Sequence, residues 1–333
     1  MSRTPRTPRP PRTSDTPGRR RSTHRVLPAL ALLTLTVGTL TACGDNDSAP
    51  EHAASAAAPA PAPASATASP SSGAGPAGVS KLRMITNDGH RLAFHVTPGT
   101  GDDRTIVLDS GGGEDSSQWK DLVPKLHAAT GATVITYDRA GLGKSDVVPG
   151  PWKVESAVDD LKAGLDELGV TENVTLVSHS QAGEIANYFA KDYPRMLSGA
   201  VLVDANLPPF FTDEQIPRLV AVSKPQVDAA MKDPDKPANR QLISTAEGFA
   251  PAHQEFHKVT WPDSVPATVI VSEKTPLDGS PEDAQHWRDA AAAFTEAGPD
   301  RTLVTAEGSS HDVPKDRPDL VLKEIESMSA TEH

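Results

Sequence analysis

The stretch VTLVSHSQAG, residues 174–183, places a serine where it could act as a nucleophile. Its first four residues form an apolar, partly β-branched run that predicts a buried strand, and residues 184–192 follow with the pattern of an amphipathic helix. A serine at the sharp turn between such a strand and helix forms a nucleophile elbow. The turn strains the backbone at Ser180, so the residues two before and two after it must be small. Ser178 and Ala182 meet that requirement, and we predict that Ser180 is the nucleophile.

A serine hydroxyl becomes reactive when a neighbouring base takes its proton. Among the 11 histidines, His311 has the setting expected of that base, because it ends the Gly/Ser-rich stretch 308–311 that follows a predicted strand. His179 is adjacent to Ser180. On an elbow its ring points away from the apex, so we expect it to pack beneath the turn.

The sequence shows no convincing set of metal ligands. His253 and His257 are four residues apart but lack the neighbouring glutamate of a zinc-binding helix. Cys43 is the only cysteine, which excludes disulfides and cysteine-based zinc sites. We therefore predict neither a metal nor any other cofactor.

The segments around these residues alternate between strands and helices. A hairpin is predicted at 81–86 and 91–97, strands at 105–109, 133–137, 174–178, 199–203, 267–271 and 302–305, and helices at 118–130, 155–168, 281–297 and 318–328. Strands with apolar residues on both faces, separated by helices, indicate a mostly parallel sheet covered on both sides. The predicted fold class is thus α/β, with one globular unit over residues 81–330.

Residues 206–265 break this alternation, with scattered prolines and no clear strand. We expect a helical cap inserted into the α/β unit. The segment carries a large share of the chain's aromatic residues, namely Phe210, Phe211, Phe249, Phe256 and Trp261. These could line an apolar pocket for the substrate, or they could pack on one another and on the sheet.

Four motifs occur in an order that resembles the α/β-hydrolase family, over about residues 81–328. They are SGGG at 110–113, DRAGLGKS at 138–145, SHSQAG at 178–183 and GSSH at 308–311. The first is similar to the family's glycine-rich oxyanion loop, with serine in place of histidine. The second is similar to a structural turn, the third to the nucleophile elbow and the fourth to the loop of the catalytic histidine.

The resemblance implies an acid that orients His311, and the sequence leaves its identity open. The family usually places an aspartate after the strand that follows the insertion, where this chain has Thr275. We favour Asp204, at the end of the preceding strand, as in some branches of the family. Asp278 is the alternative acid, and Glu273 or no acid at all are further alternatives.

The resemblance and the glycine pattern also indicate the oxyanion hole. The backbone N–H groups of Gln181, at the start of the helix after Ser180, and of Gly112 would bind the negatively charged oxygen. Glycine at this strand end permits close approach of the backbone to a substrate.

The first 42 residues have the features of an export signal. A region with eight arginines precedes an apolar run at residues 26–42, which is short for a membrane span. The run ends in Leu-Thr-Ala-Cys, which resembles a bacterial lipobox and implies lipidation of Cys43. An ordinary signal peptide is the alternative, and the route, general secretory or twin-arginine, stays open. Residues 43–80, rich in Ala, Pro and Ser, are expected to form a disordered linker.

Charge limits the classes of partner. The chain has 32 Lys and Arg against 44 Asp and Glu, a net charge of −12, and loss of the basic leader makes it about −19. An acidic protein of this kind is a poor ligand for nucleic acid or for anionic lipid. Membrane association would come from the lipid at Cys43, which would hold the protein on the outer face of the cell membrane.

The sequence therefore predicts a lipid-anchored serine hydrolase that cleaves the ester bond of a small molecule. A peptidase or amidase acting on small apolar substrates is the alternative activity. A binding lipoprotein that keeps the fold without the chemistry is the rival from another class. The substitutions at Ser110, Ser178 and Thr275 motivate that rival.

Overall fold

The computed structural model describes residues 78–101, 103–277 and 279–330. The predictions for the export signal, for lipidation of Cys43 and for most of the linker fall outside these residues. Asp278, the alternative acid, also lies outside them.

Within the described residues, eight strands form one sheet in the order β1-β2-β4-β3-β5-β6-β7-β8. The strands are β1 (Lys81–Asn87), β2 (His90–Thr97), β3 (Thr105–Asp109), β4 (Thr133–Asp138), β5 (Val174–His179), β6 (Leu197–Val203), β7 (Ala267–Ser272) and β8 (Arg301–Ala306). The β1–β2 and β2–β4 pairs are antiparallel, and the remaining pairs are parallel. The prediction of a mostly parallel sheet with an antiparallel hairpin at its edge is confirmed.

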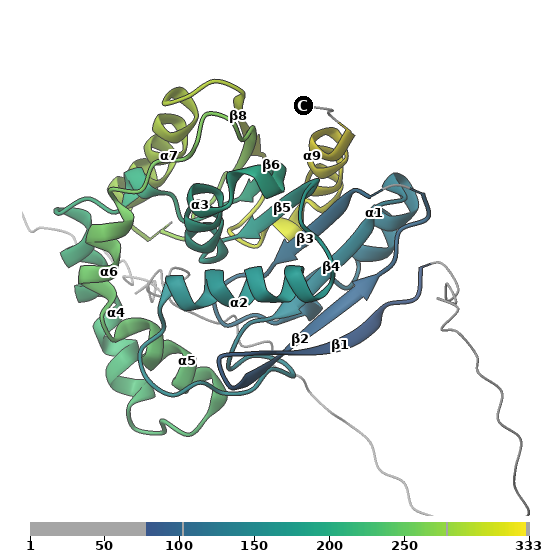
Figure 1. The fold of residues 1–333 in the computed structure, drawn as a ribbon. Helices are drawn as coiled ribbons and strands as arrows, with labels where there is room; N and C mark the ends of the chain where they lie inside the picture. The colour runs from purple at the N-terminus through teal and green to yellow at the C-terminus, as the bar shows by residue number, and fades with distance from the viewer. Residues whose placement is uncertain (1–77, 102, 278, 331–333) are drawn as a thin grey trace, which may run out of the picture.

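Helices cover both faces of this sheet (Figure 1). On one face lie α2 (Val154–Glu167), α3 (Ala182–Asp192) and α7 (Pro281–Glu296), and on the other lie α1 (Val123–Thr130) and α9 (Pro318–Ala330). Every residue of β3 and β5 is buried, which explains why these strands read as continuous apolar runs rather than alternating ones. The two apolar layers supply the main driving force for folding.

The helix predicted at 118–130 is wrong in one respect, because it is broken. A short 3-10 helix, η1 (Ser116–Trp119), precedes α1, and the side chain of Asp115 caps it by accepting from the N–H of Ser117 at 2.9 Å. Pro124 lies in the first turn of α1. Proline cannot donate to a preceding turn, so it favours a new helix start at this point.

Residues 206–265 fold into a group of helices beyond one end of the sheet (Figure 1). They are η3 (Pro208–Phe210), α4 (Gln215–Ala230), α5 (Pro237–Ala246) and α6 (Phe249–Phe256). The other short helices are η2 (Pro194–Met196) and α8 (Val313–Asp316). None of the helices in the described ranges has the length and apolar character needed to cross a bilayer.

Candidate active site

Ser180 stands at the turn between β5 and α3. Its φ of +54° lies in the left-handed region that non-glycine residues rarely adopt. The carbonyl oxygen of Ser180 stabilises the turn, because it accepts from the N–H groups of Gly183 at 2.9 Å and Asn206 at 2.8 Å. A Cβ at Gly183 would come within 2.4 Å of the Asn206 carbonyl oxygen. Glycine at 183 therefore lets α3 start directly against the chain that follows β6.

The imidazole of His311 lies between a hydroxyl and a carboxylate. Its Nε2 is 2.9 Å from Ser180 Oγ, and its Nδ1 is 2.6 Å from Asp204 Oδ2. His311 follows β8, and Asp204 follows β6. Because parallel strands end at the same edge of the sheet, three residues far apart in sequence meet beside the turn after β5. A base placed in this way can take the hydroxyl proton of Ser180 while its other nitrogen donates to Asp204.

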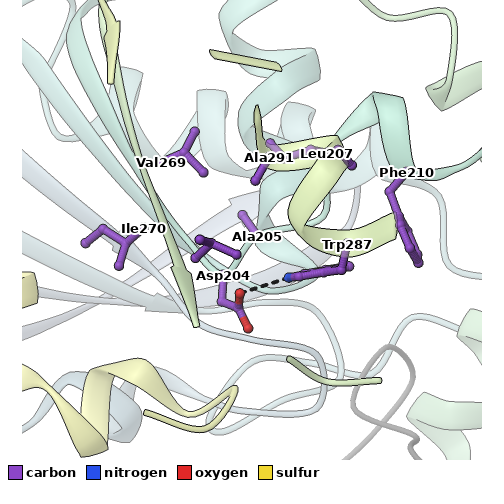
Figure 2. A pocket seen from close by; sticks show the side chains of 10 residues that line it. Asp204, Ala205, Leu207, Phe210, Val269, Ile270, Trp287 and Ala291 are labelled. Atoms are coloured by element: carbon purple, nitrogen blue, oxygen red, sulfur yellow. Dashed lines mark hydrogen bonds between the residues drawn. The ribbon is translucent and has the colours of Figure 1, made fainter. Parts of the chain in front are cut away.

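Asp204 is buried and fully hydrogen-bonded. Its Oδ1 accepts from the Ser272 N–H and from Trp287 Nε1, each at 2.9 Å, and its Oδ2 accepts from Ser272 Oγ at 2.7 Å. Figure 2 shows the Trp287 bond beside a small apolar cavity of about 10 Å³. Burial alone would raise the pKa of the Asp204 carboxyl, but the hydrogen bonds from His311 and Ser272 keep that pKa below its usual value. The carboxylate is therefore ionised and fixed in place.

Glu273, a further candidate acid, and Thr275, which stands where the family usually has its aspartate, have other hydrogen-bond partners. Glu273 Oε2 accepts from the N–H of Gly308 at 2.6 Å, and the hydroxyl of Thr275 accepts from the N–H of Leu277 at 3.3 Å. Of the carboxylates described, Asp204 is the one within hydrogen-bond distance of the His311 ring.

The expected oxyanion donors lie on the loop after β3 and on the turn after Ser180. Within the described residues, the N–H groups of Gly112 and Gln181 have no protein acceptor. A Cβ at Gly112 would come within 2.9 Å of the Gln181 side-chain oxygen, so a larger residue at 112 would push the two segments apart. Two backbone donors without acceptors beside a candidate nucleophile can bind a developing oxyanion.

Arg139 contacts the glycine-rich loop at residues 110–113, the expected oxyanion loop, and the sequence did not predict this contact. Its Nη2 donates to the Gly111 carbonyl oxygen at 2.5 Å, and its Nη1 donates to the Ser110 carbonyl oxygen and, at 2.5 Å, to Asp109 Oδ1. The peptide bond between 111 and 112 is planar and trans, so its C=O and N–H point in opposite directions. Fixing the Gly111 carbonyl on Arg139 therefore turns the Gly112 N–H away from Arg139. The arginine within DRAGLGKS was the available signal, but its partners depend on tertiary contacts.

The sequence predicts that His179 packs beneath the turn, but it lines the cleft together with Ser180, and its ring centroid lies 5.0 Å from that of His311. Its Nδ1 accepts from the Gln118 amide at 2.9 Å, and its Nε2 donates to the His311 carbonyl oxygen at 3.0 Å. Gln118 also accepts from the Gly111 N–H at 2.9 Å. Burial, with the nearby His311, lowers the pKa of His179 to about 3. A neutral His179 thus ties the oxyanion loop to the loop of the candidate base.

The cleft that contains Ser180 and His311 has a volume of about 1030 Å³. The oxyanion loop, the η1–α1 segment, the loop after β7 and the segment from His311 to α9 line it. None of the described side chains of residues 206–265 contributes to this lining. The aromatic residues of that segment are buried among themselves and against α7; for example, the rings of Phe211 and Phe256 lie 5.5 Å apart and those of Phe210 and Trp287 lie 5.0 Å apart. Of the two alternatives for these aromatic residues, the structure supports mutual packing.

Over residues 78–101, 103–277 and 279–330, no three or more His, Cys, Asp or Glu side chains come together in a group that could hold a metal ion.

Comparison with known proteins identifies the fold and the family. The sequence model of the alpha/beta hydrolase family matches residues 106–324. An uncharacterized protein of Mycobacterium tuberculosis is 33% identical over 124 residues, which are 37% of this chain and 35% of that protein. The chain thus matches about a third of the length of that relative. An uncharacterized protein of Bacillus subtilis is 26% identical over 241 residues, which cover 72% of this chain and 88% of that protein.

Solved structures resemble the chain over most of the described region. A thermophilic esterase from Thermogutta terrifontis superposes with a TM-score of 0.50 at 23% identity, covering 74% of this chain and 97% of that chain. At this identity the likeness shows the shared fold.

Proposed function

Because the chain belongs to the alpha/beta hydrolase family, we propose that it is a serine hydrolase that cleaves carboxylic esters through an acyl-enzyme intermediate. The observation that carries the proposal is the chain of hydrogen bonds from Ser180 Oγ to His311 and from His311 to Asp204, at 2.9 and 2.6 Å. The two backbone donors beside Ser180 complete the arrangement that ester hydrolysis requires.

In the first half of the reaction, Ser180 Oγ attacks the ester carbonyl carbon while His311 Nε2 takes the hydroxyl proton. The carbonyl oxygen becomes negatively charged and binds the N–H groups of Gln181 and Gly112. Asp204 stabilises the imidazolium and holds its orientation. His311 then gives the proton to the departing alcohol, which leaves Ser180 acylated.

In the second half, water replaces the alcohol. His311 Nε2 takes a proton from the water, and the resulting hydroxide attacks the acyl carbon. The tetrahedral intermediate binds the same two N–H groups, and its collapse returns the proton to Ser180 Oγ. The carboxylic acid formed from the acyl group is released, and His311 has carried each proton that was transferred.

The nucleophile argues for this reaction over others. Dehalogenase and epoxide hydrolase chemistry uses an aspartate whose ester is the intermediate, whereas the turn here carries Ser180. A peptidase or amidase is the second candidate, because the same residues can protonate an amine leaving group. The open cleft, about 1030 Å³ in volume, accommodates small substrates of both kinds.

The experiment compares esters with matched amides. Purified protein is given p-nitrophenyl esters of increasing acyl length and the corresponding p-nitroanilides, alongside the Ser180→Ala variant. The proposal expects ester hydrolysis in the wild type that the variant loses. Faster cleavage of the anilides would favour the amidase, and Ser180-independent turnover of both would contradict the proposal.

We propose further that residues 1–42 are an export signal and that Cys43 is lipidated, which would anchor the protein on the outer face of the cell membrane. Residues 43–80 would tether the hydrolase domain, residues 81–330, with its helical cap at about 206–265. The Leu-Thr-Ala-Cys sequence before Gly44 supports the anchor. Metabolic labelling with a fatty-acid analogue tests it: the wild type is expected to be labelled and Cys43→Ala is not, and equal labelling would overturn the assignment.

A further inference from the structure

We propose that the ester substrate carries a carboxylate, which four lysines around the Ser180 cleft recognise. They are Lys120, Lys125, Lys274 and Lys315, and all four line the cleft. This inference rests on the proposed function, because it names the class of ester that the same site would accept.

The segments that carry the lysines lie on both sides of β5 in the order of the strands. Lys120 and Lys125 lie on the η1–α1 segment, which follows β3, the strand on one side of β5. Lys274 follows β7, which lies beyond β6 on the other side of β5, and Lys315 lies on α8 behind His311. A substrate whose carbonyl carbon lies at Ser180 therefore lies between two segments that carry lysines.

The four lysines are exposed. Within the described chain, none of the four forms a salt bridge, whereas Lys162, Lys224 and Lys258 each pair with a carboxylate of their own helix or turn. The charge of a paired lysine is largely cancelled for a ligand, while an unpaired lysine in a cleft attracts an anion. The four lysines gather around one cleft although the chain has more acidic residues, 44, than basic residues, 32.

Three carboxylates also line the cleft, so the distribution of charge has to be weighed. They are Glu114, Asp121 and Asp312. Asp312 is half-buried, and burial, opposed by Lys315, raises the pKa of its carboxyl. The lining thus carries four lysines and three carboxylates. Beside it, hydrogen bonds from Ser310 and, more weakly, the charges of Lys315 and Lys274 lower the pKa of the Asp316 carboxyl, so this carboxylate offsets part of the positive charge.

The apolar alternative has little surface to use. The aromatic side chains of residues 206–265 pack elsewhere, and the largest apolar side chain of the cleft, Trp119, is fully buried. The lining therefore presents no exposed Phe, Tyr or Trp ring to an acyl chain, and its apolar residues other than Trp119 and the buried Leu122 are small or prolines, such as Pro276 and Pro314. The lysines are thus the side chains in this lining that could select one class of ester over another.

A matched pair of substrates tests the proposal. 4-Acetoxybenzoate carries a carboxylate on the leaving group, and its methyl ester is neutral there. The measured quantity is the ratio of kcat/KM for the anionic substrate to kcat/KM for the neutral one. The proteins are the wild type, Lys120→Gln with Lys274→Gln, Lys125→Gln with Lys315→Gln, and a control, Lys232→Gln with Lys236→Gln, which removes two exposed charges outside the cleft.

We expect each cleft pair to lower the ratio about tenfold and the control pair to leave it unchanged. Added salt should lower the ratio in the wild type and less so in the cleft variants. A ratio that the cleft variants leave unchanged, or that the control lowers equally, overturns the proposal.

Failure of the proposed function can be told apart from failure of this inference. If this inference fails, Ser180-dependent turnover remains and only the ratio of the two kcat/KM values fails to respond to the lysine changes. If the proposed function fails, neither ester shows turnover that depends on Ser180. In that event, equilibrium dialysis of 4-acetoxybenzoate against Ser180→Ala protein still reports on the lysines. Weaker binding after the Lys120→Gln and Lys274→Gln changes supports anion recognition, and equal binding overturns it.

Discussion

Arg139 Nη2 lies 2.5 Å from the carbonyl oxygen of Gly111, beneath the loop that carries a candidate oxyanion donor. The bond fixes the plane of the following peptide and hence the direction of the Gly112 N–H. Arg139 would therefore act on catalysis through the loop, without touching the substrate.

The first prediction concerns this positioning role. Arg139→Gln removes the bonds to both loop carbonyls, and Asp109→Asn is added so that no unpaired carboxylate stays buried. We expect kcat for ester hydrolysis to fall about 100-fold with a smaller change in KM, because loss of one oxyanion donor costs about that much. The measurement is steady-state kinetics well below the melting temperature. A variant that melts earlier but keeps its kcat would show that Arg139 serves stability alone.

The second prediction concerns the acid. Asp204→Asn would remove the charge that orients and stabilises the His311 imidazolium, so we expect turnover to fall by about 10,000-fold, as in other enzymes of this chemistry. Asp278→Asn is the matched control, and we expect it to change turnover little. If the ranking is reversed, Asp278 is the acid.

The third prediction uses the pKa of His179. The ring is neutral in the folded protein down to about pH 3, whereas in the unfolded chain it takes up a proton near pH 6.5. Between these values the unfolded state binds more protons, so the folded state loses stability as the pH falls, by at most about 1.4 kcal/mol per pH unit. The free energy of unfolding of the wild type minus that of His179→Gln should therefore shrink from pH 7 to pH 4 in urea titrations. A difference that is independent of pH would contradict the buried neutral ring.

The fourth prediction concerns a buried contact between α3 and α6. His253 Nδ1 faces the Phe249 carbonyl oxygen at 2.8 Å, and its Nε2 faces Glu184 Oε1 at 3.2 Å. Asn206 also donates to Glu184, at 2.6 Å.

Removing one partner of this contact leaves the other buried without its bond. We expect Glu184→Gln and His253→Phe each to lower the free energy of unfolding by about 1–3 kcal/mol, with the double variant losing less than the sum. Urea unfolding of the four proteins measures the coupling. Strictly additive losses would show that the two side chains do not interact.

Much of the architecture could be predicted from the sequence, because local patterns encode it. The continuous apolar runs of β3 and β5 predicted buried parallel strands, and the order of four motifs predicted the fold. Small residues at 178 and 182 identified the turn at Ser180. The break between η1 and α1 was missed, although Pro124 gave a local signal for it.

The rest depends on distances between residues that are remote in the sequence. Asp204 and Asp278 both follow strands at the same sheet edge, so the pattern alone could only rank them, and the structure describes Asp204 beside His311. The contact of Arg139 with the loop carbonyls has no local signature. The segment 206–265 supplied aromatic residues that could line a pocket, but only tertiary packing decides that they face one another and that lysines surround the cleft instead.

The most direct test of the whole account is covalent labelling by a fluorophosphonate, which reacts with an activated serine hydroxyl. Intact-mass measurement of the wild type, Ser180→Ala and His311→Ala follows the adduct, and folding of each protein is checked by circular dichroism. We predict one adduct on the wild type, located on Ser180 by peptide mapping, none on Ser180→Ala, and strongly slowed labelling of His311→Ala. Folded wild type that stays unlabelled, or a label on another residue, would contradict the proposed nucleophile and leave a hydrolase fold without its chemistry.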